Sequence, residues 1–185
     1  MFFSTLATLV CLGVSSIAGA KEWHATQFYT DPGQGYIQLS GEMVVPRLPR
    51  AGVYYLWPGL QPTDGSGVFQ PVLDGRSGSW WMGTGWCCSN PSLPWGAGFG
   101  VVEGDTVSFD MRRNNEAWIT NLKVPEKGLN ADGSFPLCAY LSWSLLMTAD
   151  KTMDMAIFAI ELSDVPWDFG TLAFKNIVMV IDCLE

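Results

Sequence analysis

The feature that most constrains the fold is a succession of short apolar, β-branched and aromatic runs separated by turn residues. Gly, Pro, Asn and Asp favour turns because they fix φ, tolerate positive φ or bond to the nearby backbone. Beyond residue 20 no stretch keeps a helical period over a useful length. The runs predict nine strands, at Tyr36–Val45, Val53–Trp57, Val68–Leu73, Ser79–Trp86, Thr106–Arg112, Ala117–Val124, Leu137–Met147, Met155–Leu162 and Thr171–Asp182.

Strands without helices predict two packed antiparallel sheets, an all-β sandwich or jelly roll. The chain has 185 residues, which fits one domain large enough to bury a core. Charged residues make up only 15% of it, whereas glycine, proline and aromatic residues are plentiful, a balance that favours a β-rich globular protein over a helical or disordered one. Turns are expected at Pro46–Pro49, Pro62–Gly65, Glu103–Asp105 and Asn130–Ser134.

The first twenty residues differ from the rest of the chain. They carry no charged side chain, include the apolar run Leu6–Leu12 and end in Ala18-Gly19-Ala20, a small-x-small cleavage pattern. Residues 1–20 are therefore predicted to be a secretory signal peptide, and residues 21–185 a single β-sandwich domain that is secreted and extracellular. No later segment is apolar for long enough to span a bilayer.

The charge pattern excludes several classes of partner. The net charge is −8, and a surface of that sign repels nucleic acid and anionic membranes.

The one histidine, His24, has no companion ligands at metal-binding spacing, so no metal site and no cofactor are expected. Ser-His-Asp and Cys-His catalysis are implausible for the same reason. The chain is expected to be a monomer.

Four cysteines follow the predicted signal peptide: Cys87, Cys88, Cys138 and Cys183. An even count in an oxidising compartment indicates two disulfides. Adjacent strand residues point to opposite faces, so Cys87 and Cys88 are expected to have different partners, one pairing with Cys138 and the other with Cys183. A vicinal Cys87–Cys88 bridge is the alternative.

Two polar side chains interrupt apolar strands. Along Met155–Leu162, Ile157 and Glu161 share one face, and Phe158 and Ile160 share the other. If Phe158 enters the core between the sheets, Glu161 lies on the outer face of its own sheet. Gln70 has a similar setting between Phe69 and Pro71. Both polar groups are therefore predicted to face one groove on a concave sheet.

Tryptophans are unusually frequent near Gln70. Because neighbouring strand residues alternate, one of Trp80 and Trp81 is expected in the core and the other on the face of Gln70. Indole faces beside polar groups suit stacking against sugar rings, and they equally suit an apolar peptide or small molecule. The candidate ligand-binding residues are Trp57, Asp74, Trp80, Trp81, Trp86 and Trp167.

The order of several short motifs resembles that of the fungal glutamic peptidases, the eqolisin family, which have a concanavalin A-like β-sandwich fold. The similar segments are Ser40–Pro46, Val68-Phe69-Gln70, Trp80-Trp81 with Trp86, Glu103–Val107, Ala156–Glu161 and Phe169–Asn176. They cover most of the mature chain in the family's order. The resemblance implies the same sandwich, with Gln70 at the position of the family's catalytic glutamine.

One departure from the family pattern bears on activity. The family strand has two glutamates four residues apart, and here the first position is Ile157 while the second is Glu161. If the catalytic carboxylate corresponds to position 157, the general acid/base is absent. If it corresponds to position 161, Gln70 and Glu161 form a complete dyad, in which Glu161 activates water and Gln70 stabilises the oxyanion.

Three functions follow from this pattern. The leading hypothesis is a secreted, glutamic-peptidase-like sandwich whose groove binds an extended ligand, a glycan in the first place, without classical proteolysis. The second is an active acid endopeptidase that uses Gln70 and Glu161. The third is an enzyme with the same groove that acts on an apolar small molecule. The fold occurs in lectins and enzymes alike, so it does not choose among them.

Overall fold

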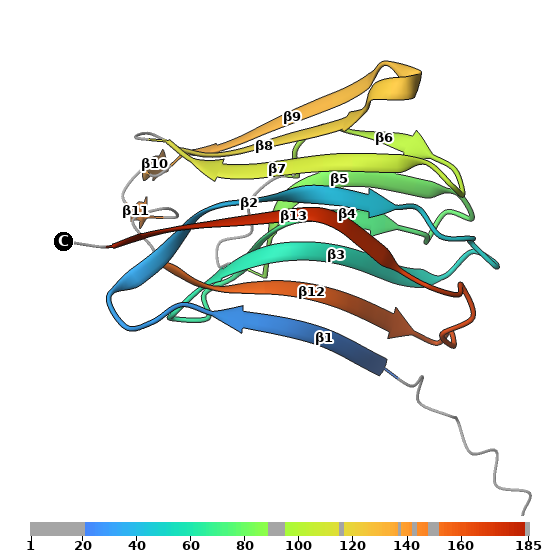
Figure 1. The fold of residues 1–185 in the computed structure, drawn as a ribbon, viewed down its shortest axis with the longest axis horizontal. Helices are drawn as coiled ribbons and strands as arrows, with labels where there is room; N and C mark the ends of the chain where they lie inside the picture. Colours follow the sequence, from blue (N-terminus) through green and yellow to red (C-terminus); the bar gives the residue numbers. More distant parts are fainter. Residues whose placement is uncertain are drawn as a thin grey trace, which may run out of the picture.

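A computed structural model describes residues 21–88, 95–114, 117–136, 138–141, 144–147 and 152–183. They form two antiparallel sheets that lie face to face, together with a separate two-stranded sheet (Figure 1). The predicted all-β, two-sheet jelly-roll sandwich is confirmed. The predicted signal peptide, residues 1–20, lies outside the described residues.

The larger sheet has six strands in the order β1-β12-β3-β4-β5-β6. Their bounds are β1 Lys21–Tyr29, β3 Val53–Pro62, β4 Val68–Asp74, β5 Trp80–Cys87, β6 Gly98–Val101 and β12 Met153–Ser163. The late strand β12 lies between β1 and β3, so its position depends on contacts that are distant in sequence.

The second sheet has five strands in the order β13-β2-β7-β8-β9. Their bounds are β2 Gln34–Val44, β7 Thr106–Arg113, β8 Ala117–Val124, β9 Leu129–Pro136 and β13 Ala173–Cys183. The separate pair is β10 Cys138–Leu141 and β11 Ser144–Met147, and a short 3-10 helix, η1, covers Pro125–Lys127. The described residues include no helix long and apolar enough to cross a membrane.

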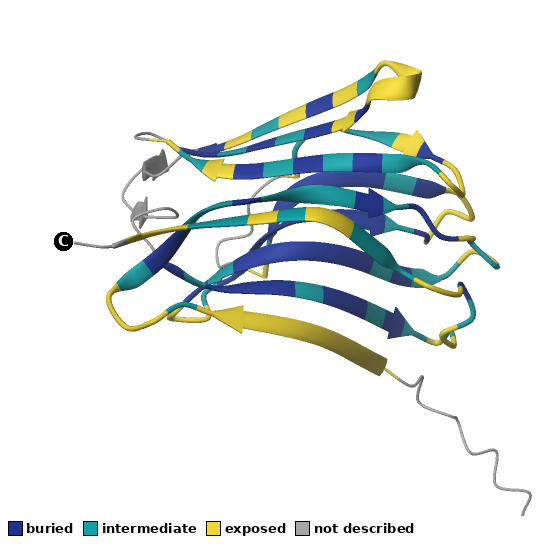
Figure 2. Cartoon of the chain, viewed as in Figure 1, coloured by how far each residue is buried: buried dark blue, intermediate teal, exposed yellow. Residues whose placement is uncertain are grey.

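The core lies between the two sheets and is built by alternation. In β7, Val107, Phe109 and Met111 are almost fully buried while the residues between them are more exposed. Phe69 from β4 packs on Trp118 from β8, with ring centroids 5.7 Å apart. Figure 2 shows this alternation along β7, whereas β1 is exposed along its whole length.

The strand prediction is wrong in three places. The strands β1 and β6 were not predicted, because β1 is exposed throughout and β6 is a short Gly-Phe-Gly-Val segment. The predicted turn Asn130–Ser134 lies inside β9, where pairing with β8 overrides its turn-favouring composition. The predicted strand Leu137–Met147 contains two paired strands, β10 and β11.

Candidate functional site

Alternation along β12 separates two sets of buried side chains. Ala156 and Ile160 belong to the cluster between the sheets, whereas Ile157 packs in a second apolar cluster with Trp57. Glu161 points to the same side as Ile157, because the two are four residues apart on one strand. The second cluster therefore lies on the outer face of the six-stranded sheet, which we call the groove face.

The strand register arranges the groove face in rows across the sheet. Trp23 in β1 lies opposite Glu161 in β12, and Glu161 lies opposite Tyr55 in β3. Tyr55 in turn lies opposite Asp74 in β4, which lies opposite Trp81 in β5. These five residues, called here the Glu161 row, project from neighbouring strands on the same side of the sheet.

Gln70 belongs to a different row. It lies opposite Gly85 in β5, and the constant register between β3 and β4 puts Gly59 on its other side. Gly59 lies opposite Ile157 in β12. The residue of β12 that shares a row with Gln70 is therefore Ile157, which is 1% exposed and sits in the apolar cluster.

The two rows keep Gln70 and Glu161 apart. Positions 157 and 161 are separated by about 13 Å along β12, and two strand spacings of about 10 Å in total separate β12 from β4. The side-chain oxygen Oε1 of Gln70 is buried without a hydrogen-bond partner among the described residues. Both residues thus face the groove, but the backbone does not bring them together as a hydrogen-bonded pair.

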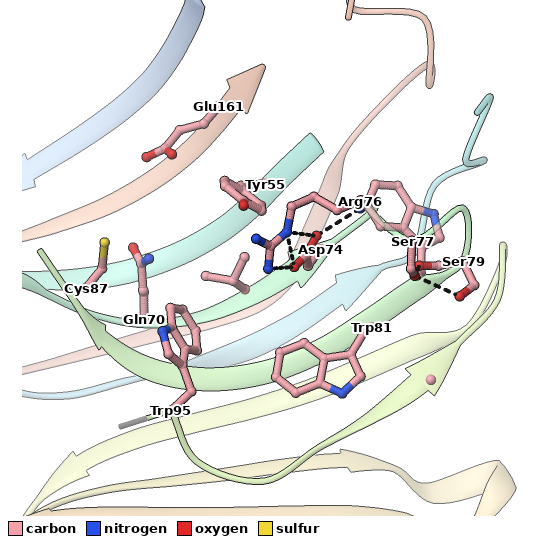
Figure 3. A pocket seen from close by; sticks show the side chains of 13 residues that line it. Tyr55, Gln70, Asp74, Arg76, Ser77, Ser79, Trp81, Cys87, Trp95 and Glu161 are labelled. Carbon is pink, nitrogen blue, oxygen red and sulfur yellow. Dashed lines mark hydrogen bonds and ion pairs between the residues drawn. The ribbon is translucent and has the colours of Figure 1, made fainter. Parts of the chain in front are cut away.

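A cavity of about 950 Å³ opens over these rows, and Figure 3 shows its lining. Its floor includes Trp81, whose ring a Cβ atom at Gly83 or Gly98 would overlap. The indole therefore lies flat on the sheet, and glycine is required beneath it because any side chain would displace the ring. The other ring face of Trp81 is left toward the cavity.

Trp95 has a similar arrangement at another part of the cavity. A Cβ atom at Gly85 would overlap its indole, and the residue is 45% exposed. Trp95 and Gln70 both line the cavity, and Figure 3 shows their side chains near one another. Two indoles on glycine supports thus give the cavity broad, flat apolar surfaces.

Two charged residues of the cavity lining, Asp74 and Arg76, form a compact ion pair. The Arg76 guanidinium donates to both oxygens of Asp74, with the Nη2–Oδ2 distance at 2.7 Å. The same guanidinium lies 5.3 Å from the centre of the Tyr55 ring. Asp74 is therefore neutralised by Arg76, and its carboxylate is already occupied by donors.

Burial raises the pKa of the Glu161 carboxyl above the usual glutamate range. The indole N–H groups of Trp23 and Trp57 approach the carboxylate and act in the opposite direction. Among the described residues, the buried Trp57 N–H has no partner in hydrogen-bond geometry. Glu161 is thus a carboxyl that keeps its proton to higher pH than an exposed glutamate does.

This raised pKa predicts a pH-dependent contribution to stability. The folded state holds the Glu161 proton more tightly than the unfolded state, so the contribution is present in acid and is lost as pH rises above the usual glutamate pKa. Glu161→Gln should remove this dependence. Unfolding of both proteins, measured between about pH 3 and about pH 7, should show the variant gaining relative stability as pH rises. A difference that is independent of pH would contradict the prediction.

The structure corrects the interpretation of two tryptophans as groove residues. Trp80 and Trp86 point into the core, because even-numbered positions of β5 face the second sheet, and each is 3% exposed. Although Trp80 borders the cavity, its indole N–H donates to the Pro46 carbonyl at 2.8 Å. Trp81 takes the groove face, as alternation within the pair predicted.

Trp57 and Trp167 also differ from the expectation of open ligand platforms. Trp57 lies on the groove face but is 3% exposed, with its ring close to Gly59 and packed in the cluster of Ile157. The Trp57 ring is therefore part of the packed layer beneath the groove and offers no open surface to a ligand. Trp167 is 46% exposed but stacks on Phe169 and lies outside the cavity lining. Its ring also packs on His24, with ring centroids 5.0 Å apart.

The cysteine pairing differs from the expected long-range bridges. The structure joins Cys87 to Cys88, which is the vicinal alternative. Strand alternation fails at this point because β5 ends at Cys87 and Cys88 adopts a positive φ of 68°, which turns its side chain back toward its neighbour. The side chains of Cys138 and Cys183 lie outside the described residues.

Sequence reasoning missed several lining residues, and the largest of them are Tyr55, Arg76 and Trp95. Arg76 follows Asp74 by two residues in a turn, a spacing that suggests an ion pair but not its position over Tyr55. Trp95 lies beyond the predicted strand. Its contact with Gly85 and the hydrogen bond from the Gly96 N–H to the Thr84 carbonyl place it on the sheet. The described residues include no cluster of three or more His, Cys, Asp or Glu able to hold a metal ion.

No family model matches the sequence, and no curated protein matches it. Solved structures are similar in fold. Scytalido-glutamic peptidase with a peptide-based transition-state analogue aligns with a TM-score of 0.57 and 13% identity, over 88% of this chain and 77% of that one. Its complex with a transition-state analogue inhibitor gives 0.55 and 15% identity over the same shares. Lactose- and MES-liganded congerin II aligns with a TM-score of 0.43 and 11% identity, over 85% of this chain and 100% of that one.

These similarities bear on the resemblance to glutamic peptidases. At such low identities they show a shared β-sandwich fold and do not show membership of the family. The function must therefore be argued from the side chains of the groove.

Proposed function

We propose that the chain is a secreted protein whose groove binds an extended, hydroxyl-rich glycan without proteolysis. The observation that carries the proposal is the Trp81 ring, held flat on Gly83 and Gly98 with its other face toward the cavity. A flat indole matches the apolar C–H face of a sugar ring, and polar groups beside it match the hydroxyls at the ring edge. Secretion rests on the sequence of residues 1–20.

The polar groups of the cavity suit binding better than peptide hydrolysis. Hydrolysis at Gln70 requires a carboxyl that activates water next to the amide. The residue of β12 in the row of Gln70 is Ile157, which has no carboxyl group. The carboxylate of Asp74 is already bound by the Arg76 guanidinium. The third carboxyl, that of Glu161, lies two rows of side chains away from the row of Gln70 and Ile157. It can accept hydrogen bonds from ligand hydroxyls or donate to them.

The proposal is tested by binding to insoluble and soluble polysaccharides with a matched pair of variants. Trp81→Ala should weaken binding by about 1–3 kcal/mol, on the scale of aromatic stacking against flat rings of nucleic acid bases. Trp167→Ala removes an indole outside the cavity and should leave the affinity unchanged. Isothermal titration or depletion from a suspension measures both. Equal losses in the two variants, or no binding by the wild type, would refute the proposal.

A further inference from the structure

A second cavity adjoins the first one on the far side of Glu161. Its volume is about 420 Å³, and Lys21, Trp23 and Ser163 are among its lining residues. Tyr55 and Glu161 line both cavities. The two cavities therefore meet at these two side chains, and the groove continues past Glu161 to the edge strand β1.

Trp23 gives this second cavity a surface of the same kind as the first. It lies opposite Glu161 in the register of β1 and β12 and is 52% exposed. The Glu161 row thus runs from an exposed indole in β1, past Glu161, Tyr55 and Asp74, to the indole of Trp81 in β5. Four strand spacings make this row about 19 Å long.

The polar groups between the two indoles favour a neutral ligand. Asp74 and Arg76 form a closed ion pair that adds no net charge. Burial raises the pKa of Glu161, so this carboxyl keeps its proton, and with it the ability to donate to a hydroxyl group, to higher pH than an exposed glutamate does. With a net charge of −8 on the whole chain, an acidic glycan is disfavoured relative to a neutral one.

We propose that Trp23 and its cavity form a second subsite, so that one neutral oligosaccharide runs across the strands from Trp81, over Glu161, to Trp23. The inference rests on the proposed glycan-binding function and specifies the length and direction of the ligand. A span of about 19 Å exceeds a disaccharide, so short ligands occupy one indole and longer ligands occupy both. Occupying both surfaces with one chain raises affinity because the second contact becomes intramolecular.

The experiment measures the affinity of β-1,3- and β-1,4-linked neutral gluco-oligosaccharides by isothermal titration, over lengths from two to about six rings. Affinity should rise with length until both indoles are reached. Trp23→Ala should lower the affinity of the longest ligands by about 5- to 150-fold, and it should leave that of the shortest ones unchanged. The length dependence is a readout that general loss of structure would not reproduce.

Phe28→Ala is the matched control, because Phe28 lies on the same exposed strand and is 43% exposed. It faces the other side of β1, where it packs on Phe158. This variant should bind long and short ligands as the wild type does. Binding that depends on Trp81 but not on length or Trp23 would overturn the second subsite alone. Absence of binding to every oligosaccharide in the series would overturn both proposals.

Discussion

Replacing Trp80 by alanine should lower the free energy of unfolding by about 3–5 kcal/mol, the scale for removing a large aromatic side chain from a core. The indole is 3% exposed and packs edge-on to Tyr54, with ring centroids 6.3 Å apart. Its loss also leaves the Pro46 carbonyl without the indole N–H donor. Denaturant unfolding measures this loss as a lower transition midpoint. The slope of the free energy of unfolding against denaturant concentration should be unchanged.

Trp81→Ala is the control for this experiment, since the two residues are adjacent and point to opposite faces. Trp81 is partly exposed and rests on glycines, so its removal should cost about 1 kcal/mol of stability, near the centre of the range for point mutations. The same variant should carry the loss of ligand affinity. Similar destabilisation in the two variants would contradict the division of β5 into a core face and a groove face.

The faces of the strands could be predicted from the sequence, because alternation is a local property. It placed Trp80 and Trp81 on opposite sides and put Gln70 and Glu161 on the face that lines the cavity. Alternation has a period of two, however, and gives the same answer for every even shift of one strand along another. It therefore could not show whether residue 157 or residue 161 shares a row with Gln70.

The register required contacts between strands distant in the sequence. The strand β12 reaches β4 only through β3, and the Ile157–Gly59 pair fixes its position. The strand β1 escaped prediction because an edge strand exposed on both faces shows no alternation of burial. Because β1 was not predicted, Trp23 was not recognised as a groove residue. It lies on the groove face only because β1 pairs with β12.

Ile157→Glu should confer acid proteolysis that the wild type lacks. The substitution puts a carboxyl in the row of Gln70, where a general base and an oxyanion donor would lie on the same part of the sheet. Position 157 is 1% exposed, so a glutamate there should cost about 1–3 kcal/mol of stability. This loss should be smaller in acid, because desolvation raises the pKa of a buried carboxyl and keeps it protonated.

Cleavage of a denatured protein substrate is the measurement, made from about pH 3 to about pH 7 so that the range includes a glutamate pKa raised by burial. Ile157→Gln is the matched control, because glutamine has nearly the same size and polarity as glutamate but cannot accept a proton from water. Adding Gln70→Ala to Ile157→Glu should lower the rate by about 10²–10³, the effect of losing one oxyanion donor. A folded but inactive Ile157→Glu protein would show that the Gln70 row is not a latent hydrolytic site. Cleavage by the wild type that Glu161→Gln abolishes would instead make Glu161 the carboxyl that activates water and would overturn the non-proteolytic function.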